Sequence, residues 1–64
     1  MKPSELKDFL GKRCNVVYIN KQGSTINRKL DVKDLTYVPL YGDYLICDVE
    51  DICLDRITSV HLLM

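Results

Sequence analysis

The stretch from residue 43 to residue 57 constrains the fold of this chain more than any other. Two short runs rich in apolar and β-branched side chains, residues 44–49 and 52–54, flank the acidic pair Glu50 and Asp51. Runs of this length separated by two polar residues are typical of a β-hairpin. The upstream segments are therefore expected to pair with this hairpin.

The register of the hairpin decides which of its side chains are buried. If the two acids form the loop, Val49 pairs with Ile52, and the alternation of side chains places one apolar set on a single face. That set is Leu45, Cys47, Val49, Ile52 and Leu54. An acidic pair is an unusual choice for a tight turn, which favours Asn-Gly, so a four-residue loop with a different pairing is the alternative.

A short amphipathic helix is predicted near the N-terminus. Leu6, Phe9 and Leu10 have the spacing of one helix face, and Gly11 follows as a stop signal. A helix of about two turns is too short to be stable alone, so its apolar stripe must pack against something. It either covers one open end of a sheet or binds a partner.

Two strands are predicted on either side of a glycine-containing turn. Residues 12–20 are predicted to form the first strand, residues 25–32 alternate in polarity and form the second, and Lys21 to Ser24 closes the hairpin, with Gly23 available for a positive φ. In the first strand Cys14, Val16 and Tyr18 share one face and Val17 and Ile19 the other, so both faces are apolar in the middle, as expected of a central strand or one that bends between two sheets. In the second strand Ile26, Leu30 and Val32 lie on one side.

Arg28 interrupts the alternation of the second strand, because it falls in register with Ile26 and Leu30. Its guanidinium either extends to water at the rim of the sheet or is held by a partner carboxylate or an anionic ligand. A planar guanidinium suits bidentate contact with phosphate or carboxylate, so Arg28 is the best candidate for a ligand contact.

The segment that links the second strand to the hairpin contains further apolar residues. We expect the strand to extend or bend to about Val38, with Leu35, Tyr37 and Leu40 able to bury, before a turn marked by Pro39. A turn or a single 3₁₀ turn is predicted at residues 55–59, and a last short strand at residues 60–63.

These elements amount to five short strands and one helix in a single domain, residues 1–64. Short strands with regular turns favour a small closed barrel, because closure removes exposed strand edges. The predicted fold class is mainly β, a small five-stranded SH3-like or Sm-like β-barrel over residues 12–64 with a short N-terminal α-helix within residues 1–11.

Charge is balanced overall but unevenly distributed. The nine basic and nine acidic residues give a net charge of zero, so no bulk positive charge favours nucleic acid. Residues 1–33 hold eight Lys or Arg and three Asp or Glu (8 − 3 = +5), and residues 34–64 hold one and six (1 − 6 = −5). The two halves either form separate patches or interleave when the sheet closes.

The three cysteines, Cys14, Cys47 and Cys53, are odd in number and lack Cys-x-x-Cys spacing, so neither a disulfide framework nor a zinc site is indicated. We expect them to be small hydrophobes in a reducing cytosol. No apolar run has the length of a membrane span, and the charged start lacks the core of a signal peptide. The predicted location is cytoplasmic, with no membrane contact.

No catalytic set is indicated, and the chain is predicted not to be an enzyme and to have no metal and no cofactor. His61 is the only histidine, and no motif places a nucleophile beside it. The acids Asp48, Glu50 and Asp51 are interpreted as a solvated turn. Arg56 is either an ion-pair partner of Asp55, which would cap the turn there, or a ligand contact.

The chain also resembles a known family. The residues that carry the resemblance are Tyr18-x-Asn20, Gly23, Arg28, Leu35, Gly42-Asp43-Tyr44-Leu45 and Leu54-Asp55-Arg56-Ile57-x-x-Val60. This series is similar to the WYL domain, found mostly in bacterial transcriptional regulators and related defence proteins, and it covers residues 12–63. Asp43 stands where the family has the tryptophan of its name.

The resemblance implies an Sm-like barrel with an N-terminal helix and a regulatory ligand, a nucleotide or single-stranded nucleic acid. The ligand-facing residues implied are Tyr18, Arg28, Tyr44 and Arg56. Tyrosines interleaved with basic residues on a strand face would also suit single-stranded nucleic acid. The alternative is a protein-interaction or homo-oligomer module without a small ligand, using a strand edge or the Leu6, Phe9 and Leu10 stripe.

Overall fold

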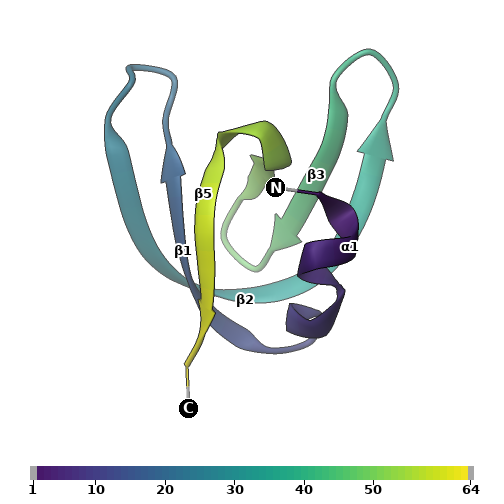
Figure 1. The fold of residues 1–64 in the computed structure, drawn as a ribbon, viewed down its shortest axis with the longest axis vertical. Coiled ribbons are helices and arrows are strands. Elements are labelled where there is room, and N and C mark those ends of the chain that lie inside the picture. The colour runs from purple at the N-terminus through teal and green to yellow at the C-terminus, as the bar shows by residue number, and fades with distance from the viewer. Residues whose placement is uncertain (1, 64) are drawn as a thin grey trace.

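The computed structural model describes residues 2–63, which form one antiparallel five-stranded sheet and a short N-terminal helical segment (Figure 1). The strands are β1 (Arg13–Ile19), β2 (Thr25–Val38), β3 (Gly42–Cys47), β4 (Asp51–Cys53) and β5 (Ile57–Leu62). Their order across the sheet is β4-β3-β2-β1-β5. The mainly β prediction, with five strands and one short helix, is confirmed; the end residues 1 and 64 lie outside the described residues.

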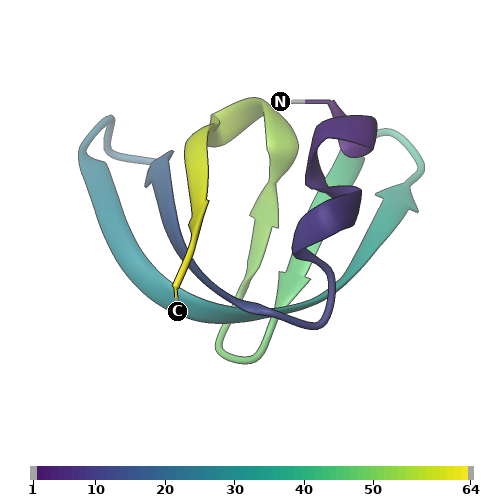
Figure 2. The ribbon, with the colours of Figure 1, turned by 60° about the horizontal axis from the view of Figure 1, so that its bottom comes forward.

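The long strand β2 connects the two halves of the sheet. Its first half pairs with β1, and its second half pairs with β3 after a change of register between Val32 and Asp34. Figures 1 and 2 show β2 as an arc from the β1–β2 turn to the β2–β3 turn. The predicted extension of this strand to about Val38 is confirmed.

The curved sheet encloses one apolar core. Of the two apolar faces of β1, the one with Cys14, Val16 and Tyr18 is buried, and so are Leu30 and Val32, which were expected to share one side of β2. The other buried core residues are Leu6, Leu45, Cys47, Ile52, Leu54, Ile57 and Val60. Because these residues come from the helical segment, all five strands and the turn before β5, the whole chain contributes to a single core.

The N-terminal segment forms two helical turns of different kinds. They are α1 (Pro3–Leu6) and a 3₁₀ helix over Lys7–Phe9, so the predicted helix over residues 5–10 starts earlier and ends as a 3₁₀ turn. Leu6 is fully buried, and Phe9 and Leu10 pack against the core. The stripe therefore covers the sheet, the first of the two roles considered for it.

The β3–β4 hairpin is present, but its predicted loop is wrong. Leu45 pairs with Ile52, and the backbone N–H of Cys47 donates to the carbonyl oxygen of Glu50 at 3.1 Å. The turn is thus Asp48 and Val49, neither the acidic pair nor a four-residue loop. The observed pairing differs from the predicted one by an even number of residues, so the predicted apolar side chains still share one face. Val49 is the exception, because it lies in the turn and is exposed.

Contacts with β2 hold the turn at Asp48. The Asp31 N–H donates to the Asp48 carboxylate at 3.0 Å, and the Asp48 N–H donates to the Asp31 carbonyl at 3.1 Å. The Asp31 carboxylate also accepts from Arg13 at 2.9 Å. A loop at residues 50 and 51 would break the contacts of Asp48, and nothing in the local sequence reveals them.

The β2–β3 turn differs from expectation as well. Leu35 is half-buried, but Tyr37 and Leu40 are exposed, at 67% and 99%. Figure 1 shows why, since the end of this hairpin, like that of the β1–β2 hairpin, extends past β5, η2 and α1, and within residues 2–63 no other element covers it. The expected burial of Tyr37 and Leu40 is therefore wrong.

The chain from β4 to β5 runs through the 3₁₀ helix η2 (Leu54–Arg56), so the turn predicted at residues 55–59 begins at Leu54 and β5 begins before residue 60. β4 and β5 are the two edge strands of the sheet, and within the described residues no ladder joins them. No helix in residues 2–63 has the length and apolarity needed to cross a membrane.

Candidate functional site

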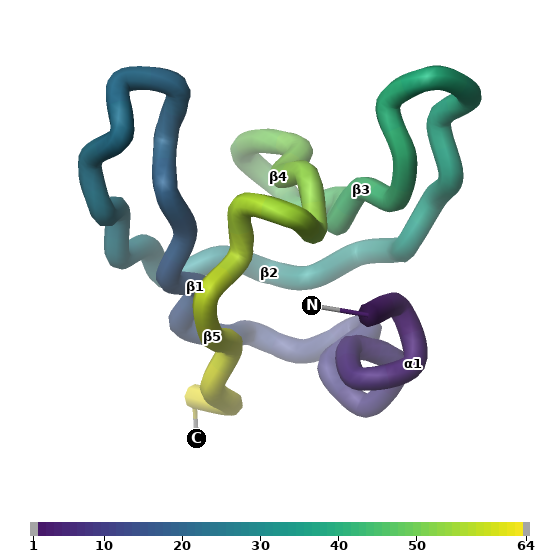
Figure 3. Tube along the Cα trace, turned by 45° about the horizontal axis from the view of Figure 1, so that its top comes forward, coloured from purple at the N-terminus to yellow at the C-terminus, as the bar shows by residue number. Residues whose placement is uncertain are grey.

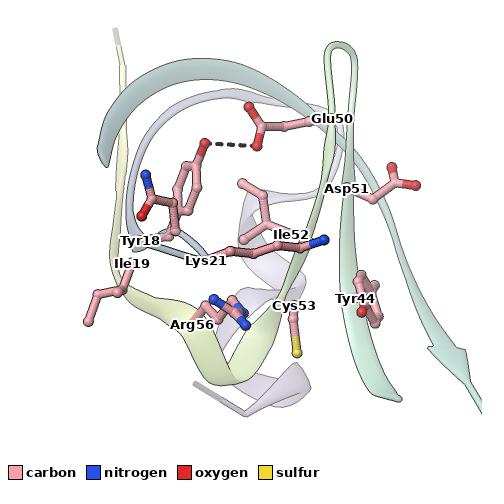
Figure 4. Close-up of a pocket in the computed structure, with 10 residues that line it drawn as sticks. Tyr18, Ile19, Lys21, Tyr44, Glu50, Asp51, Ile52, Cys53 and Arg56 are labelled. Atoms are coloured by element: carbon pink, nitrogen blue, oxygen red, sulfur yellow. Dashed lines mark hydrogen bonds between the residues drawn. The ribbon is translucent and has the colours of Figure 1, made fainter. Parts of the chain in front are cut away.

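A cavity of about 230 Å³ lies between the β1–β2 turn, β4 and η2. Its lining residues are Tyr18, Ile19, Asn20, Lys21, Tyr44, Glu50, Asp51, Ile52, Cys53 and Arg56. Figure 4 shows the side chain of Tyr18 on one side and that of Tyr44 on the other, with those of Lys21, Ile52 and Cys53 between them in this view. The site is therefore assembled from segments that are distant in the sequence.

The structure brings three of the four ligand-facing residues predicted from the sequence to this cavity. Tyr18 enters from the end of β1, Tyr44 from β3 and Arg56 from η2. Arg28, the fourth, does not line the cavity, although it contacts a residue that does. The predicted set is thus divided into three lining residues and one supporting residue.

Glu50 connects the two walls of the cavity. Its carboxylate accepts a hydrogen bond from the Tyr18 hydroxyl at 2.8 Å and another from the Arg28 guanidinium at 2.6 Å. Tyr18 and Arg28 belong to the β1–β2 hairpin, whereas Glu50 follows the β3–β4 turn. The interpretation of Glu50 as a solvated turn residue is wrong, and of the roles considered for Arg28, pairing with a carboxylate is the one observed.

The environment of Tyr18 keeps its hydroxyl neutral. Burial raises the pKa of Tyr18, and the hydrogen bond to Glu50 and the charge of that carboxylate raise it further. The side chain is only 7% exposed. Tyr18 is therefore a hydrogen-bond donor fixed on the cavity wall.

Lys21 and Arg56 supply positive charge at the cavity. The two ion pairs among the described residues are Arg13–Asp31 and Arg28–Glu50, so neither Lys21 nor Arg56 is paired there. Counting Arg28, three basic groups face two acidic ones, Glu50 and Asp51. The region has an excess of one positive charge, although the whole chain is neutral.

The β1–β2 turn fixes the position of Lys21. The Asn20 side-chain oxygen accepts from the backbone N–H groups of Gln22 at 3.0 Å and Ser24 at 2.9 Å. Gly23 has φ of +84°, as the sequence predicted. Lys21 is also one of the basic residues, with Lys12, Arg13 and Arg28, whose interleaving with tyrosines was expected to suit single-stranded nucleic acid, and the structure places it at the cavity.

Arg56 is positioned by the single turn of η2. The helix has no side-chain cap hydrogen bond, so the cap expected from Asp55 is not present. Among residues 2–63, Arg56 does not form the ion pair with Asp55 that was one of its two expected roles. Of the two roles considered for Arg56, its place in the cavity wall favours the ligand contact.

The thiols and the histidine do not form a reactive group with this cavity. Cys14 and Cys47 are buried and free, and burial raises the pKa of Cys47 to about 11. Cys53 is free and partly exposed at the cavity, while His61 lies exposed on β5. Within residues 2–63, no group of three or more His, Cys, Asp or Glu side chains is arranged to hold a metal ion.

Comparison with protein-family models, curated proteins and solved structures finds no match to this chain. The site is therefore interpreted from its own geometry and from the pattern of residues in the sequence.

Proposed function

We propose that this protein is a non-enzymatic regulatory module that binds a nucleotide or single-stranded nucleic acid in the cavity between Tyr18, Tyr44 and Arg56. The observation that carries the proposal is that these three residues, singled out from the sequence, line one cavity together with Lys21. The proposal includes a relationship to WYL domains, an SH3-like or Sm-like barrel, a cytoplasmic location and a role in transcriptional regulation.

The chemistry of the lining suits one nucleotide unit. The Tyr44 ring offers a face on which a base stacks, a contact that single-stranded nucleic-acid binders use widely. Lys21 and Arg56 offer charged donors for a phosphate group. A cavity of about 230 Å³ is smaller than the roughly 300–1,000 Å³ typical of pockets for drug-sized ligands, which favours a single base over a stacked pair.

Arg28 has a supporting role in this proposal. Its ion pair neutralises Glu50, whose carboxylate would otherwise repel a phosphate group at the cavity. The same contact bridges the β1–β2 hairpin and the β3–β4 turn, and it supports the proposed barrel by joining opposite walls of the curved sheet through side chains.

The test is fluorescence anisotropy with labelled single-stranded DNA and RNA, titrated from low to moderate salt, with mononucleotides as competitors. Arg56→Gln and Lys21→Gln should each weaken binding several-fold and reduce its salt dependence, because each removes one phosphate contact. The matched control is Lys29→Gln, which removes an exposed lysine of β2 outside the cavity and should leave specific binding unchanged. Absence of binding by the wild-type protein even at low salt would refute the proposal.

A second set of variants distinguishes direct contact from charge compensation. Arg28→Ala should weaken binding because it leaves Glu50 unneutralised, and the double variant Arg28→Ala/Glu50→Gln should regain most of the loss. If the double variant stays as weak as Arg28→Ala, Arg28 contacts the ligand itself and the supporting role is wrong.

A further inference from the structure

The β2–β3 turn carries three exposed apolar side chains that the cavity does not use. Tyr37 and Tyr41 are 67% and 69% exposed, and Leu40 between them is 99% exposed. We call these three residues the apolar tip. A contiguous set of large apolar side chains that lacks contacts within its own fold marks an interaction surface.

The backbone of the apolar tip forms a strained turn in which the side chain of Leu40 is exposed. The Tyr41 N–H donates to the Val38 carbonyl at 3.0 Å, Pro39 comes second in the turn, and Leu40 has φ of +76°. These are the features of a type II turn, whose third position favours glycine. A leucine there costs about 1–2 kcal/mol relative to an unstrained backbone, and its side chain recovers nothing by burial within the chain.

The charges beside the apolar tip select the kind of partner. Asp43 pairs with Tyr37 at its base, and Asp34 lies exposed further down the same hairpin. These carboxylates disfavour nucleic acid and anionic membranes and favour a basic surface. The partner surface should therefore combine an apolar depression with unpaired cations.

The cavity of the same chain has that combination. Ile19 and Ile52 contribute apolar walls, and Lys21 and Arg56 are its unpaired cations. An apolar cavity of about 150 Å³ already holds a benzene-sized molecule, so a cavity of about 230 Å³ has room for the side chain of Leu40.

The apolar tip and the cavity also lie at the same end of the molecule. Figures 1 and 3 show the β1–β2 and β2–β3 turns projecting from the same end of the molecule on opposite sides, with β4 and η2 between them. Two copies that face each other across a two-fold axis can therefore each insert a tip beside the other's β1–β2 turn. Such an arrangement is self-complementary and closes at two subunits.

We propose that the chain forms a reciprocal homodimer in which the apolar tip of each copy occupies the cavity of the other. Leu40 enters the cavity, and Asp43 faces Lys21 and Arg56 of the opposite copy. Two tyrosines and one leucine bring on the order of 400 Å² of exposed side chain per copy. With both tips and both cavities covered, the buried area reaches the lower range of specific interfaces, at about 1,000 Å², so association should be weak and reversible.

The first test is sedimentation velocity of the full chain over a wide range of concentration, without nucleotide. The wild-type protein should shift from monomer to dimer as its concentration rises, and Leu40→Gly should remain monomeric. Leu40→Gly keeps the fold, because glycine suits φ of +76°. The control is Val49→Ser at the β3–β4 turn, an exposed apolar residue that belongs neither to the apolar tip nor to the cavity lining, and this variant should dimerise as the wild type does. A wild-type protein that stays monomeric, or that grows beyond dimers, overturns the proposal.

The second test uses two variants that each lack one half of the contact. Leu40→Gly retains the cavity, and Arg56→Glu retains the apolar tip but repels Asp43. Isotope-labelled Leu40→Gly mixed with unlabelled Arg56→Glu should show amide shifts at residues 18–21 and 50–56, because one tip and one cavity remain intact. Labelled Leu40→Gly mixed with unlabelled Leu40→Gly should show none. Shifts elsewhere, or none in the first mixture, contradict the tip-in-cavity contact.

These outcomes are separable from those of the nucleotide proposal. Leu40→Gly leaves every residue lining the cavity in place, so nucleotide binding should persist in a variant that no longer dimerises. A protein that dimerises but binds no nucleotide refutes only the proposed function, and the converse result refutes only the homodimer.

Discussion

The two hairpin turns at the same end of the molecule are built in opposite ways. The β1–β2 turn follows local rules, since the Asn20 side chain accepts two backbone N–H groups and a glycine occupies the position with φ of +84°. The β2–β3 turn does not follow these rules, because a leucine, Leu40, occupies a position with φ of +76°, where glycine is preferred, and its side chain is almost fully exposed. Similar backbone demands are met by glycine in one turn and by leucine in the other.

The difference separates a structural turn from an interaction surface. The β1–β2 turn stabilises the chain and fixes Lys21 beside the cavity, so its residue choices are explained within one molecule. The β2–β3 turn is less stable than a glycine would make it, and its exposed leucine has no function within one molecule. Strain that nothing in the fold repays points to a role outside the fold.

The largest effect is expected from placing leucine in the turn that has glycine. An added Cβ at Gly23 meets no atom within 4 Å, so Gly23→Leu tests the backbone conformation alone. We expect it to lower the free energy of unfolding by about 1–2 kcal/mol, measured by urea denaturation. Gly23→Asn should cost less, because asparagine tolerates the left-handed region. If leucine and asparagine at position 23 lowered the free energy of unfolding by the same amount, the β1–β2 turn would tolerate no side chain there. The φ values of Gly23 and Leu40 would then not explain the difference between the two turns.

The reciprocal change should have a smaller effect of opposite sign. Leu40→Gly relieves the strained φ but gives the unfolded chain more freedom, so the net gain in the free energy of unfolding should be below about 1 kcal/mol. The measurement is urea denaturation at a concentration where the wild-type protein is monomeric. A loss of more than about 1 kcal/mol would show that Leu40 stabilises the monomer, and its exposure would then not indicate a partner.

The parts of the fold that the sequence predicts are those governed by local periodicity. The residues that the pattern groups on one face, Cys14, Val16 and Tyr18 in β1 and Leu30 and Val32 in β2, are buried together, and Gly23 has the expected positive φ. Tyr18, Tyr44 and Arg56 were predicted from a pattern of residues, and the fold brings them to one cavity. The local features of the strands and of the β1–β2 turn required no knowledge of the pairing between distant segments, and the role of the three cavity residues as ligand contacts stays a prediction.

The errors arise where a contact between distant residues overrides a local preference. Asp48 is held at the turn by Asp31, which is 17 residues away, and the Tyr18–Glu50 contact spans 32 residues. No local pattern distinguishes Glu50 from its acidic neighbours as the residue that reaches Tyr18. The same limit applies to Leu40, because the sequence shows an apolar residue without showing that the hairpin extends past the core.

The last expected effect depends on pH and concerns Tyr18, the strand residue that leads into the β1–β2 turn. Its pKa is raised from the ordinary value of 10.0, chiefly by burial and then by its hydrogen bond to Glu50. Because the folded state holds the proton more tightly than the unfolded state, the stabilisation is complete below pH 10.0 and is lost as pH rises through the folded-state pKa.

Tyr18→Phe should therefore lower stability at neutral pH by about 1 kcal/mol, the usual worth of one hydrogen bond, and the difference from the wild type should shrink at alkaline pH. The measurement is the urea midpoint across this pH range. The raised pKa of Cys47, at about 11, gives the same trend in both proteins and cancels in the difference. Tyr41→Phe, which alters an exposed tyrosine of the β2–β3 turn, should follow the wild-type curve. If Tyr18→Phe kept a constant difference from the wild type at every pH, the Tyr18–Glu50 hydrogen bond would not contribute to stability, and the Arg28–Glu50 ion pair alone would link the two walls of the cavity.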